Sequence, residues 1–201
     1  MTCSDDECLV LRKRNAQLEN EVADLKRQVL VLVQQTLIDH LTGLHDQCAF
    51  LEALPGHIEL AKREEIELTL CIIDLDRFKS INDTHGHPVG DEVIRSVGKI
   101  LRECARSGDY LARLGGDEFV AVLFGASAET AQVFAERVRT RIEQTSLAAT
   151  DSGAKIYCTA SIGLCELGES DSHVFYQDAD RALYRAKGRG RNGVCIVSLD
   201  N

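Results

Sequence analysis

The sequence has little of several features that would each indicate a class of protein. Near the N-terminus the longest apolar run is VLVLV, residues 29–33, far short of the ~20 residues that a membrane-spanning helix needs. The first residues, MTCSDDEC, are polar and acidic, unlike a secretory signal. A formal net charge of -9 argues against the basic face of a nucleic-acid-binding protein. We therefore expect a cytoplasmic protein that binds no nucleic acid and is at most attached to a membrane through a partner.

Paired metal-binding cysteines are also absent. The chain has eight cysteines, but none of them forms a CxxC pair. Cys71, Cys158 and Cys165 lie in apolar, strand-like runs, so we expect reduced thiols that pack as small hydrophobic side chains. With 201 residues, 44% of them hydrophobic and 27% charged, the chain is long enough for one globular domain and an extension.

A seven-residue repeat is present before residue 37. Leucines recur at the d positions and mostly β-branched or small residues at the a positions; these are Leu11, Leu18, Leu25 and Leu32 at d, and Cys8, Asn15, Val22 and Val29 at a. This pattern is typical of a two-stranded coiled coil, in which a polar a residue such as Asn15 sets the register. We predict a coiled-coil dimerisation stalk over residues 1–37 and a globular domain over residues 38–201.

The charges beside the seam favour a parallel homodimer. In a parallel pair, Arg14 faces Glu19 and Glu21 faces Lys26 of the other chain, and both pairs attract. The alternative is a single amphipathic helix packed on its own domain. Such a helix would extend ~45 Å, which is long for a domain of this size.

Beyond the stalk, hydrophobic periodicity and turn residues predict alternating helices and strands. We expect helices over residues 47–63, 79–83, 89–106, 127–144 and 174–187, and strands over residues 67–74, 155–167 and 194–199. Residues 109–114 and 117–124 should form a hairpin around a Gly115-Gly116 turn. Pro88 should precede the helix that starts at residue 89. The fold class is α/β (α+β), with a central mixed β-sheet flanked by helices.

Two carboxylates are expected to meet where the hairpin and a strand end. Asp117 follows the two glycines, and Asp74 ends the strand ELTLCIID. On adjacent antiparallel strands these groups would repel, and one would hold its proton unless a cation neutralised them. A site of carboxylates with few waters suits Mg²⁺. Two metal ions held by carboxylates near a strand end are a familiar arrangement in enzymes that catalyse in-line attack on phosphorus. The alternative is a solvated hairpin tip.

Separate motifs together resemble one family. RLGGDEF (113–119), DLDRFKSINDTHGHPVGDEVI (74–94) and DADRALYRAKGRGRN (178–192) are similar to the motifs of GGDEF-domain diguanylate cyclases, in the same order and spacing. DHLTGL (39–44) resembles the opening turn of that family and TASIGL (159–164) its late strand. The resemblance covers residues 39–197 and implies a nucleotidyl-cyclase-like fold and the synthesis of cyclic di-GMP, a bacterial second messenger, from two GTP.

The resemblance also implies roles for individual residues. Asp74, the carbonyl group of Leu75 and Asp117 would hold two Mg²⁺ ions, for which Mn²⁺ could substitute; Glu118 would lie in the same site as a ligand, a support or a base. Lys79, Lys187 and Arg191 match phosphate contacts, and the amides of Phe78 and Lys79 would add anion donors at a helix start.

Guanine recognition is assigned to the segment between the first two motifs. Asn82 and Asp91 resemble the guanine-reading pair of the family, and an amide with a carboxylate fits the donor and acceptor edge of guanine. His87, between them, is counted with the substrate-binding residues. Asp91 also disfavours a product that contains adenine.

The implied mechanism needs two copies of the domain. Each binds one GTP, and each 3′-hydroxyl attacks the α-phosphate of the opposite nucleotide. The stalk would supply the homodimer by raising the local concentration of the second half-site.

A second site is implied by Arg106 and Asp109, which match the RxxD product-inhibition motif of the family, where cyclic di-GMP would bind as inhibitor. Arg137 falls where an auxiliary contact is often found. The ordinary alternative for RxxD is a salt bridge at a helix end.

The sequence departs from the family at two points. Asp46-Gln47 stands where Asn-Arg is common, and Arg77 stands where an aromatic residue or histidine is often found. Two other functions remain open: a catalytically weak module that binds GTP or cyclic di-GMP, and a stalk that mainly docks a regulatory protein.

Overall fold

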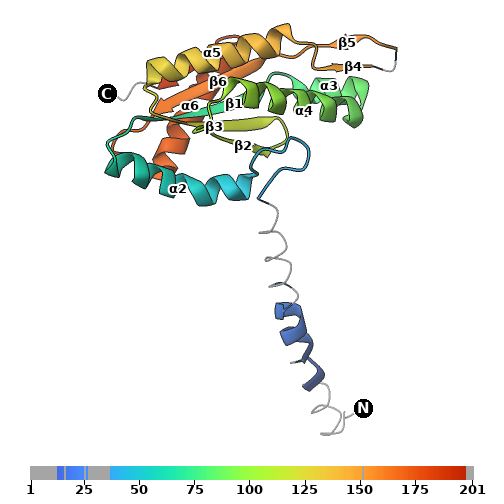
Figure 1. The fold of residues 1–201 in the computed structure, drawn as a ribbon. Coiled ribbons are helices and arrows are strands. Elements are labelled where there is room, and N and C mark those ends of the chain that lie inside the picture. The colour runs from blue at the N-terminus through green and yellow to red at the C-terminus, as the bar shows by residue number, and fades with distance from the viewer. Residues whose placement is uncertain (1–12, 16, 25, 27–36, 151, 198–201) are drawn as a thin grey trace. The chain divides into compact units, whose positions relative to one another are not determined.

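A computed structural model of the chain describes residues 13–15, 17–24, 26, 37–150 and 152–197. The chain divides into two units, Met1–Leu37 and Ile38–Asn201. In the first unit the described residues 13–15, 17–24 and 26 are helical (Figure 1). Leu18 and Val22 are exposed. Most of the predicted heptad positions lie outside the described residues, so the coiled coil stays a prediction.

The second unit is built around a five-stranded sheet of order β2-β3-β1-β6-β7. The strands are β1 (Leu68–Leu75), β2 (Tyr110–Gly115), β3 (Glu118–Phe124), β6 (Ala160–Glu166) and β7 (Val194–Val197). β1 pairs antiparallel with β3 on one side and β6 on the other, while β7 runs parallel to β6. The sheet is therefore mixed, as predicted.

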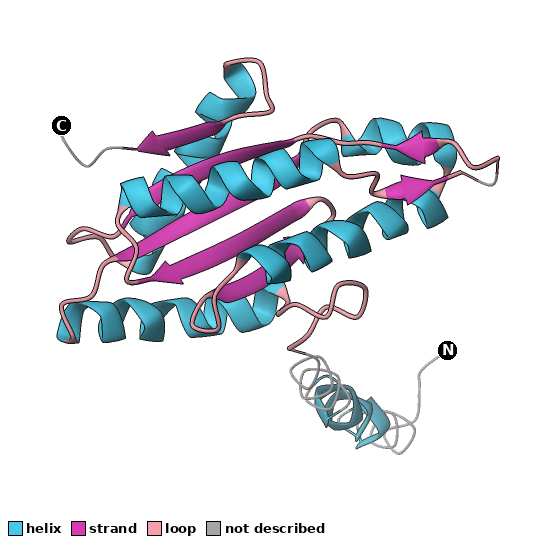
Figure 2. Ribbon diagram, turned by 45° about the horizontal axis from the view of Figure 1, so that its top comes forward, coloured by secondary structure: helices cyan, strands magenta, loops and turns pink. Residues whose placement is uncertain are grey.

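Helices cover both faces of this sheet (Figure 2). They are α2 (Gln47–Arg63), α3 (Phe78–His85), α4 (His87–Cys104), α5 (Ala128–Gln144) and α6 (Ser172–Gly188). Because side chains alternate along a strand, Ile73 of β1 packs in a core with α3, α4 and α5, while its neighbour Ile72 packs with α2 and α6. Across the part of the chain that the structure describes, no helix has both the length and the apolarity to cross a bilayer.

The element predictions are mostly confirmed, with three corrections. The predicted strand 155–167 is two strands: β5 (Lys155–Ile156) pairs with β4 (Ala148–Ala149) in a separate ribbon, and β6 alone joins the main sheet. Pro88 lies inside the first turn of α4, where a missing N–H costs nothing. The two-residue hairpin turn is Gly116-Asp117, one position later than predicted, since Gly115 pairs with Glu118 as part of β2.

The third correction has a local cause. The β2–β3 register shifts between Arg113 and Gly115, so β2 carries one extra residue, Leu114, in a bulge. Gly115 and Gly116 have φ of 133° and 52°, values that favour glycine. The bulge moves the turn by one residue and places Asp117 in the turn itself.

One glycine sets the distance between α6 and the sheet. A Cβ on Gly163 of β6 would lie 2.2 Å from the amide nitrogen of Leu183 and 2.3 Å from the carbonyl oxygen of Ala179. α6 therefore lies directly on the backbone of β6. Since β6 is the neighbour of β1, this close packing brings the C-terminal end of α6 to the end of β1.

Candidate active site

The acidic residues of the two predicted strand ends meet in the structure. Asp74 of β1 is paired directly with Glu118 of β3, so their side chains share one face of the sheet. The amide of Leu75 donates to the carbonyl oxygen of Asp117 at 3.2 Å. The prediction that the hairpin tip lies beside the end of β1 is confirmed.

A cation from a third element completes this cluster. The Lys187 ammonium group, near the end of α6, lies 2.7 Å from a carboxylate oxygen of Asp74. Lys187 had been predicted only as a phosphate contact. The ion pair shows that the ammonium group lies at the predicted metal site itself.

The cluster disfavours negative charge. Burial raises the pKa of Asp74, and Asp117 and Asp76 add to the increase, while Lys187 opposes it. Burial also raises the pKa of Glu118, assisted by Asp74 and Asp117 and again opposed by Lys187. Several carboxylates with one cation between them form a site that a further cation would stabilise.

The donor atoms of this site fit a magnesium ion that is shared with a substrate. Among the described residues, no group of three His, Cys, Asp or Glu side chains could by itself hold a metal. Mg²⁺ is usually bound by one or two carboxylates, with waters and substrate phosphates as the other ligands. Asp74, Asp117 and the main chain at Leu75 offer only oxygen donors of this kind, so the residues fit Mg²⁺ bound together with a triphosphate.

The hairpin that carries Asp117 is held by an arginine whose role the sequence did not indicate. Arg113 donates to the carbonyl oxygen of Gly116 at 2.8 Å and to a carboxylate oxygen of Asp39 at 2.9 Å. Asp39 in turn accepts bonds from the amide and the hydroxyl group of Thr42. Arg113 thus connects the DHLTGL turn, at the start of the domain, to the tip of the hairpin. Its place two residues before the Gly115-Gly116 pair was the available signal.

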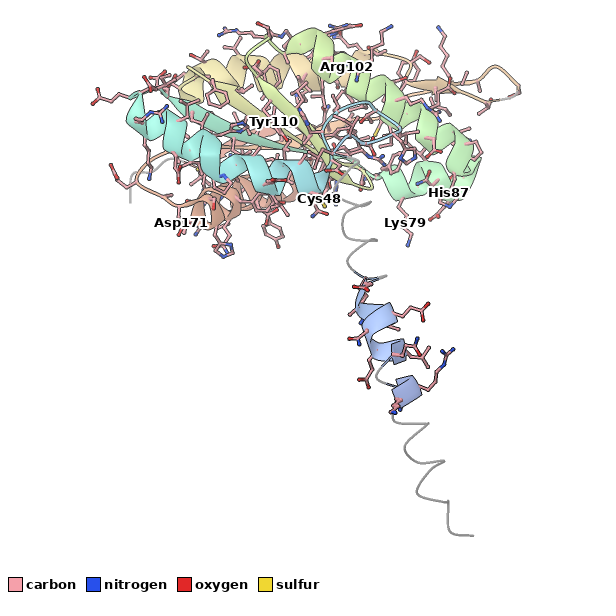
Figure 3. The ribbon with its side chains drawn as sticks, turned by 60° about the horizontal axis from the view of Figure 1, so that its bottom comes forward. Cys48, Lys79, His87, Arg102, Tyr110 and Asp171 are labelled. Carbon is pink, nitrogen blue, oxygen red and sulfur yellow. The ribbon has the colours of Figure 1, made fainter. Side chains whose placement is uncertain are left out.

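The predicted phosphate donors lie at the start of α3. Arg77, the residue before the helix, has a left-handed conformation with φ of 58°. Phe78 is buried, so it can offer a ligand only its backbone amide, whereas Lys79 is exposed. Figure 3 shows Lys79 and His87 projecting from the α3–α4 end of the domain.

The predicted guanine-reading residues come from consecutive helices. Asn82 lies on α3 and Asp91 on α4, and Gly86, with φ of 82°, separates the two helices. The Oδ1 atom of Asn82 is buried and has no hydrogen-bond partner within the described part of the chain. A Cβ on Gly90 would lie 1.9 Å from this atom, so the missing side chain of Gly90 makes the room for the amide. Asp91 is exposed.

The two departures from the family pattern have local explanations. Asp46 caps α2, because its carboxylate accepts a bond from the amide of Ala49 at 2.8 Å. Gln47 is the first residue of α2. Arg77 supplies the left-handed residue that starts α3. Neither departure removes a residue of the acidic cluster.

The three residues of the predicted inhibitory site line one cavity of about 320 Å³. The amide of Arg106 donates to a carboxylate oxygen of Asp109 at 2.7 Å, which closes the turn between α4 and β2. Arg137 of α5 donates to the carbonyl oxygen of Cys104 at 2.7 Å. Apolar side chains, among them Phe124 of β3, form most of the rest of the wall. Glu129 adds a second carboxylate to the lining. Two arginines and two acidic residues around an apolar wall suit a ligand with phosphates and flat bases that carry hydrogen-bond donors.

Comparisons with known proteins agree on one family. Residues 36–193 match the family described as "Diguanylate cyclase, GGDEF domain". Diguanylate cyclase DosC of Escherichia coli (strain K12) is 43% identical over 158 residues, which are 78% of this chain and 34% of that protein. The chain therefore spans about a third of the length of this relative.

Two solved structures resemble nearly the whole chain. The coiled coil and GGDEF domain of DgcB from Caulobacter crescentus, in complex with c-di-GMP, has a TM-score of 0.78 and 29% identity, and covers 93% of this chain and 99% of that one. Diguanylate cyclase SiaD from Pseudomonas aeruginosa, in complex with its activator SiaC, has a TM-score of 0.77 and 27% identity, and covers 96% of this chain and 74% of that one.

Proposed function

Because the chain belongs to the GGDEF family of diguanylate cyclases, we propose that it condenses two GTP molecules into cyclic di-GMP and two pyrophosphates. The observation that carries the proposal is the meeting of Asp74, Glu118 and the Asp117 turn beside Lys187, at the end of the central strand. Asn82, one helix away, supplies a buried amide oxygen that lacks a partner among the described residues.

The acidic cluster would position the triphosphate. Asp74, Asp117 and the Leu75 carbonyl group would hold two Mg²⁺ ions, or Mn²⁺ in their place. Bound metal would neutralise charge on the phosphates and lower the pKa of the attacking hydroxyl group. Lys187 now lies against Asp74 and would turn to a phosphate when metal takes over the carboxylate. Lys79, Arg191 and the amides at the start of α3 would bind the outer phosphates.

The guanine base would be read between α3 and α4. Asn82 and Asp91 would pair with complementary donors and acceptors of guanine, with His87 at the exposed rim. A nucleotide held at both its base and its phosphates would be fixed in one orientation. It would then present its 3′-hydroxyl group to a second nucleotide rather than to its own α-phosphate.

Two domains therefore have to face each other. The oxygen of each 3′-hydroxyl group forms a bond to the opposite α-phosphorus, its proton is lost, and the bond to pyrophosphate breaks. Positioning and electrostatic stabilisation carry most of such a reaction. We propose that the stalk supplies this homodimer, and that cytoplasmic GTP is the substrate.

The cavity at Arg106, Asp109 and Arg137 would bind cyclic di-GMP as a feedback inhibitor. The proposal is supported by the convergence of these three side chains on one cavity, away from the acidic cluster. Because a product bound there would not displace GTP, inhibition should be non-competitive with respect to GTP.

The direct test is incubation of the full chain with GTP and Mg²⁺, followed by chromatography of the nucleotides. We expect cyclic di-GMP and two equivalents of pyrophosphate. Asp117→Ala should lose about 10³-fold or more in rate while its circular dichroism spectrum is unchanged. Arg106→Ala should form product at the wild-type initial rate, with weaker inhibition by added cyclic di-GMP. Undiminished turnover by Asp117→Ala would overturn the assignment of the site.

A regulated, weakly active module is the second candidate. The similarity over 96% of this chain to SiaD, which was solved with an activator, favours a protein partner for the stalk. If the chain binds GTP but forms no product by itself, this second function replaces the first.

A further inference from the structure

The carboxylate of Asp76, close to the proposed metal site, is hydrogen-bonded by other groups of the protein. Asp76 follows β1 and is buried, with 7% of its surface exposed. Its carboxylate accepts three bonds: from the hydroxyl groups of Thr159 at 2.7 Å and Ser161 at 2.6 Å, and from the amide of Asn192 at 2.9 Å. Both carboxylate oxygens therefore already accept hydrogen bonds from the protein. A carboxylate that binds a metal ion would instead keep an oxygen free for the ion.

The segment that Asp76 holds has a strained backbone. Arg191 and Asn192 have φ of 67° and 43°, the left-handed region that non-glycine residues rarely adopt. Two consecutive residues keep such a conformation only where the surroundings impose it. The bond from the Asn192 amide to Asp76 is one of the contacts that impose it.

The side chain of Asn192 provides a second anchor. Its Oδ1 atom accepts a bond from Arg139 at 2.7 Å, and its Nδ2 atom donates to Glu143 at 2.7 Å. Both partners lie on α5, and they bond to each other at 2.9 Å. Asn192 is therefore tied to α5 through its side chain and to Asp76 through its backbone.

The segment that contains Arg191 is thus attached to the end of β1 on both sides. Before it, Lys187 contacts Asp74; after it, Asn192 contacts Asp76. The two acids of the sequence DLD, residues 74–76, have different tasks: Asp74 faces the proposed metal site, and Asp76 holds the Arg191 segment.

We infer that Asp76 is a positioning residue: it holds the Arg191–Asn192 segment in its strained conformation, so that Arg191 is presented to the triphosphate. The inference rests on the proposed function, in which Arg191 binds phosphate. It separates Asp76 from the metal ligands, although both acids lie in the same motif.

The chemistry of Asp76 offers a matched pair of variants. Asp76→Ala removes all three bonds. Asp76→Asn keeps an oxygen for Thr159 and Asn192, and its new amide group can donate to the Ser161 hydroxyl group, which also accepts. Asp76→Asn therefore preserves the positioning hydrogen bonds and removes only the negative charge. A carboxylate that bound a metal ion could not lose this charge without an effect on activity.

The experiment measures binding of a non-hydrolysable GTP analogue with Mg²⁺, together with kcat and KM for GTP, in the full chain. Asp76→Ala should weaken analogue binding and raise KM by about tenfold, the loss of one charge-assisted phosphate contact. Arg191→Ala should have a similar effect. The double variant Asp76→Ala with Arg191→Ala should be no weaker than Arg191→Ala alone, because both changes remove the same contact. Asp76→Asn should stay within about threefold of the wild type.

Two results would overturn the inference. If the losses of analogue affinity in the two single variants multiply in the double variant, Asp76 acts independently of Arg191. A loss in Asp76→Asn as large as in Asp76→Ala would show that the charge itself is needed. Should Asp76→Ala not fold, Asp76→Asn still tests whether the charge is needed, and a loss of more than about threefold in its affinity for the analogue would overturn the inference.

A measurement without nucleotide separates this inference from the proposed function. Hydrogen exchange should show the Asn192 amide protected in the wild type and in Asp76→Asn, but about 10²-fold less protected in Asp76→Ala. An unprotected Asn192 amide in the wild type would overturn the positioning role. Protection without any cyclic di-GMP synthesis would instead count against the proposed function.

Discussion

At the scale of single residues, the acids of the site are in an environment that opposes their charge. Asp74 and Glu118 are paired across β1 and β3, and burial with neighbouring carboxylates raises the pKa of both. A raised pKa means that the folded state binds more protons than the unfolded one between the ordinary and the raised value. The contribution of these groups to stability therefore falls as pH rises through that window.

Glu118→Gln should consequently stabilise the metal-free domain. At pH 7 we expect a higher midpoint of thermal unfolding, because the variant removes a carboxylate whose ionisation is opposed in the folded state. The gain should shrink as pH falls and vanish below the ordinary pKa of 4.5, where the carboxyl group is protonated in both the folded and the unfolded wild type. Thermal unfolding against pH in a chelator measures it.

The matched control is Glu92→Gln, on the exposed side of α4, which should leave stability unchanged. Product formation by Glu118→Gln should fall by about 10²-fold. A Glu118→Gln domain that is less stable than the wild type at pH 7 would contradict the electrostatic reasoning.

Gly90→Ala should damage guanine recognition without touching a charge. The added methyl group would lie 1.9 Å from Asn82 Oδ1 and 3.2 Å from Cζ of Phe78, so the Asn82 side chain must move. We expect affinity for a GTP analogue to fall by about tenfold, in line with the loss of one or two hydrogen bonds. Calorimetry with the isolated variant measures the affinity.

Gly56→Ala is the control for this substitution. Gly56 lies inside α2, and apart from its chain neighbours and the backbone of its own helix, no described atom comes within 4 Å of the position of its added Cβ. This variant should bind the analogue as the wild type does and gain about 0.5–1 kcal/mol of stability. If Gly90→Ala bound the GTP analogue with the same affinity as the wild type, the position of the Asn82 side chain would not matter for binding.

At the scale of elements, the site depends on how closely α6 packs on β6. The contact runs through Gly163, and it brings Lys187 to the end of β1. In Gly163→Ala, the methyl group would meet the helix backbone rather than a flexible side chain, so the whole element must shift. We expect a loss of about 3 kcal/mol in the free energy of unfolding by denaturant. A change of less than about 0.5 kcal/mol would mean that α6 can move without cost.

The N-terminal turn and the hairpin form a second pair of connected elements. Arg113 bonds both Asp39 and the carbonyl oxygen of Gly116, which directly precedes Asp117. A displacement of the DHLTGL turn would therefore reach the hairpin tip through a single side chain. This contact offers a physical route by which a movement of the DHLTGL turn alters the acidic cluster.

At the scale of the whole molecule, each domain contains one half of the proposed reaction. A paired stalk would hold the second half at an effective concentration on the order of millimolar. Leu18→Ser with Leu25→Ser removes two d positions and should make the specific rate of product formation rise steeply with protein concentration. Light scattering should show the wild type as a dimer and the variant as a monomer at micromolar concentration.

Substitutions on the opposite face of the helix control for surface effects. Lys13→Ser with Asn20→Ser changes two f positions, one in the heptad of Leu18 and one in the heptad before it, and should leave both dimer and rate unchanged. A wild-type chain that is monomeric at the concentrations of the assay would remove the stalk hypothesis.

Much of the fold was predictable because its signals are local. Hydrophobic periodicity and turn residues predicted helix 47–63 with the bounds that α2 has, and the two glycines indicated the hairpin. The proximity of Asp74 and Asp117 was predicted on the assumption that their strands are neighbours and from the motif resemblance, since the pairing of β1 with β3 is not a local property. A register shift of one residue in β2 was not visible, since a bulge depends on how both strands pack.

By itself, the sequence determined the elements, the mixed sheet and the residue types of the site, because periodicity, turn chemistry and motif order are properties of neighbouring residues. Only the tertiary structure decided the strand order β2-β3-β1-β6-β7 and the partners that it brings together. Lys187 meets Asp74, and Asn192 meets Asp76 across 116 positions of the chain. Contacts over such separations arise from the packing of α6 on the sheet, and no local pattern encodes them.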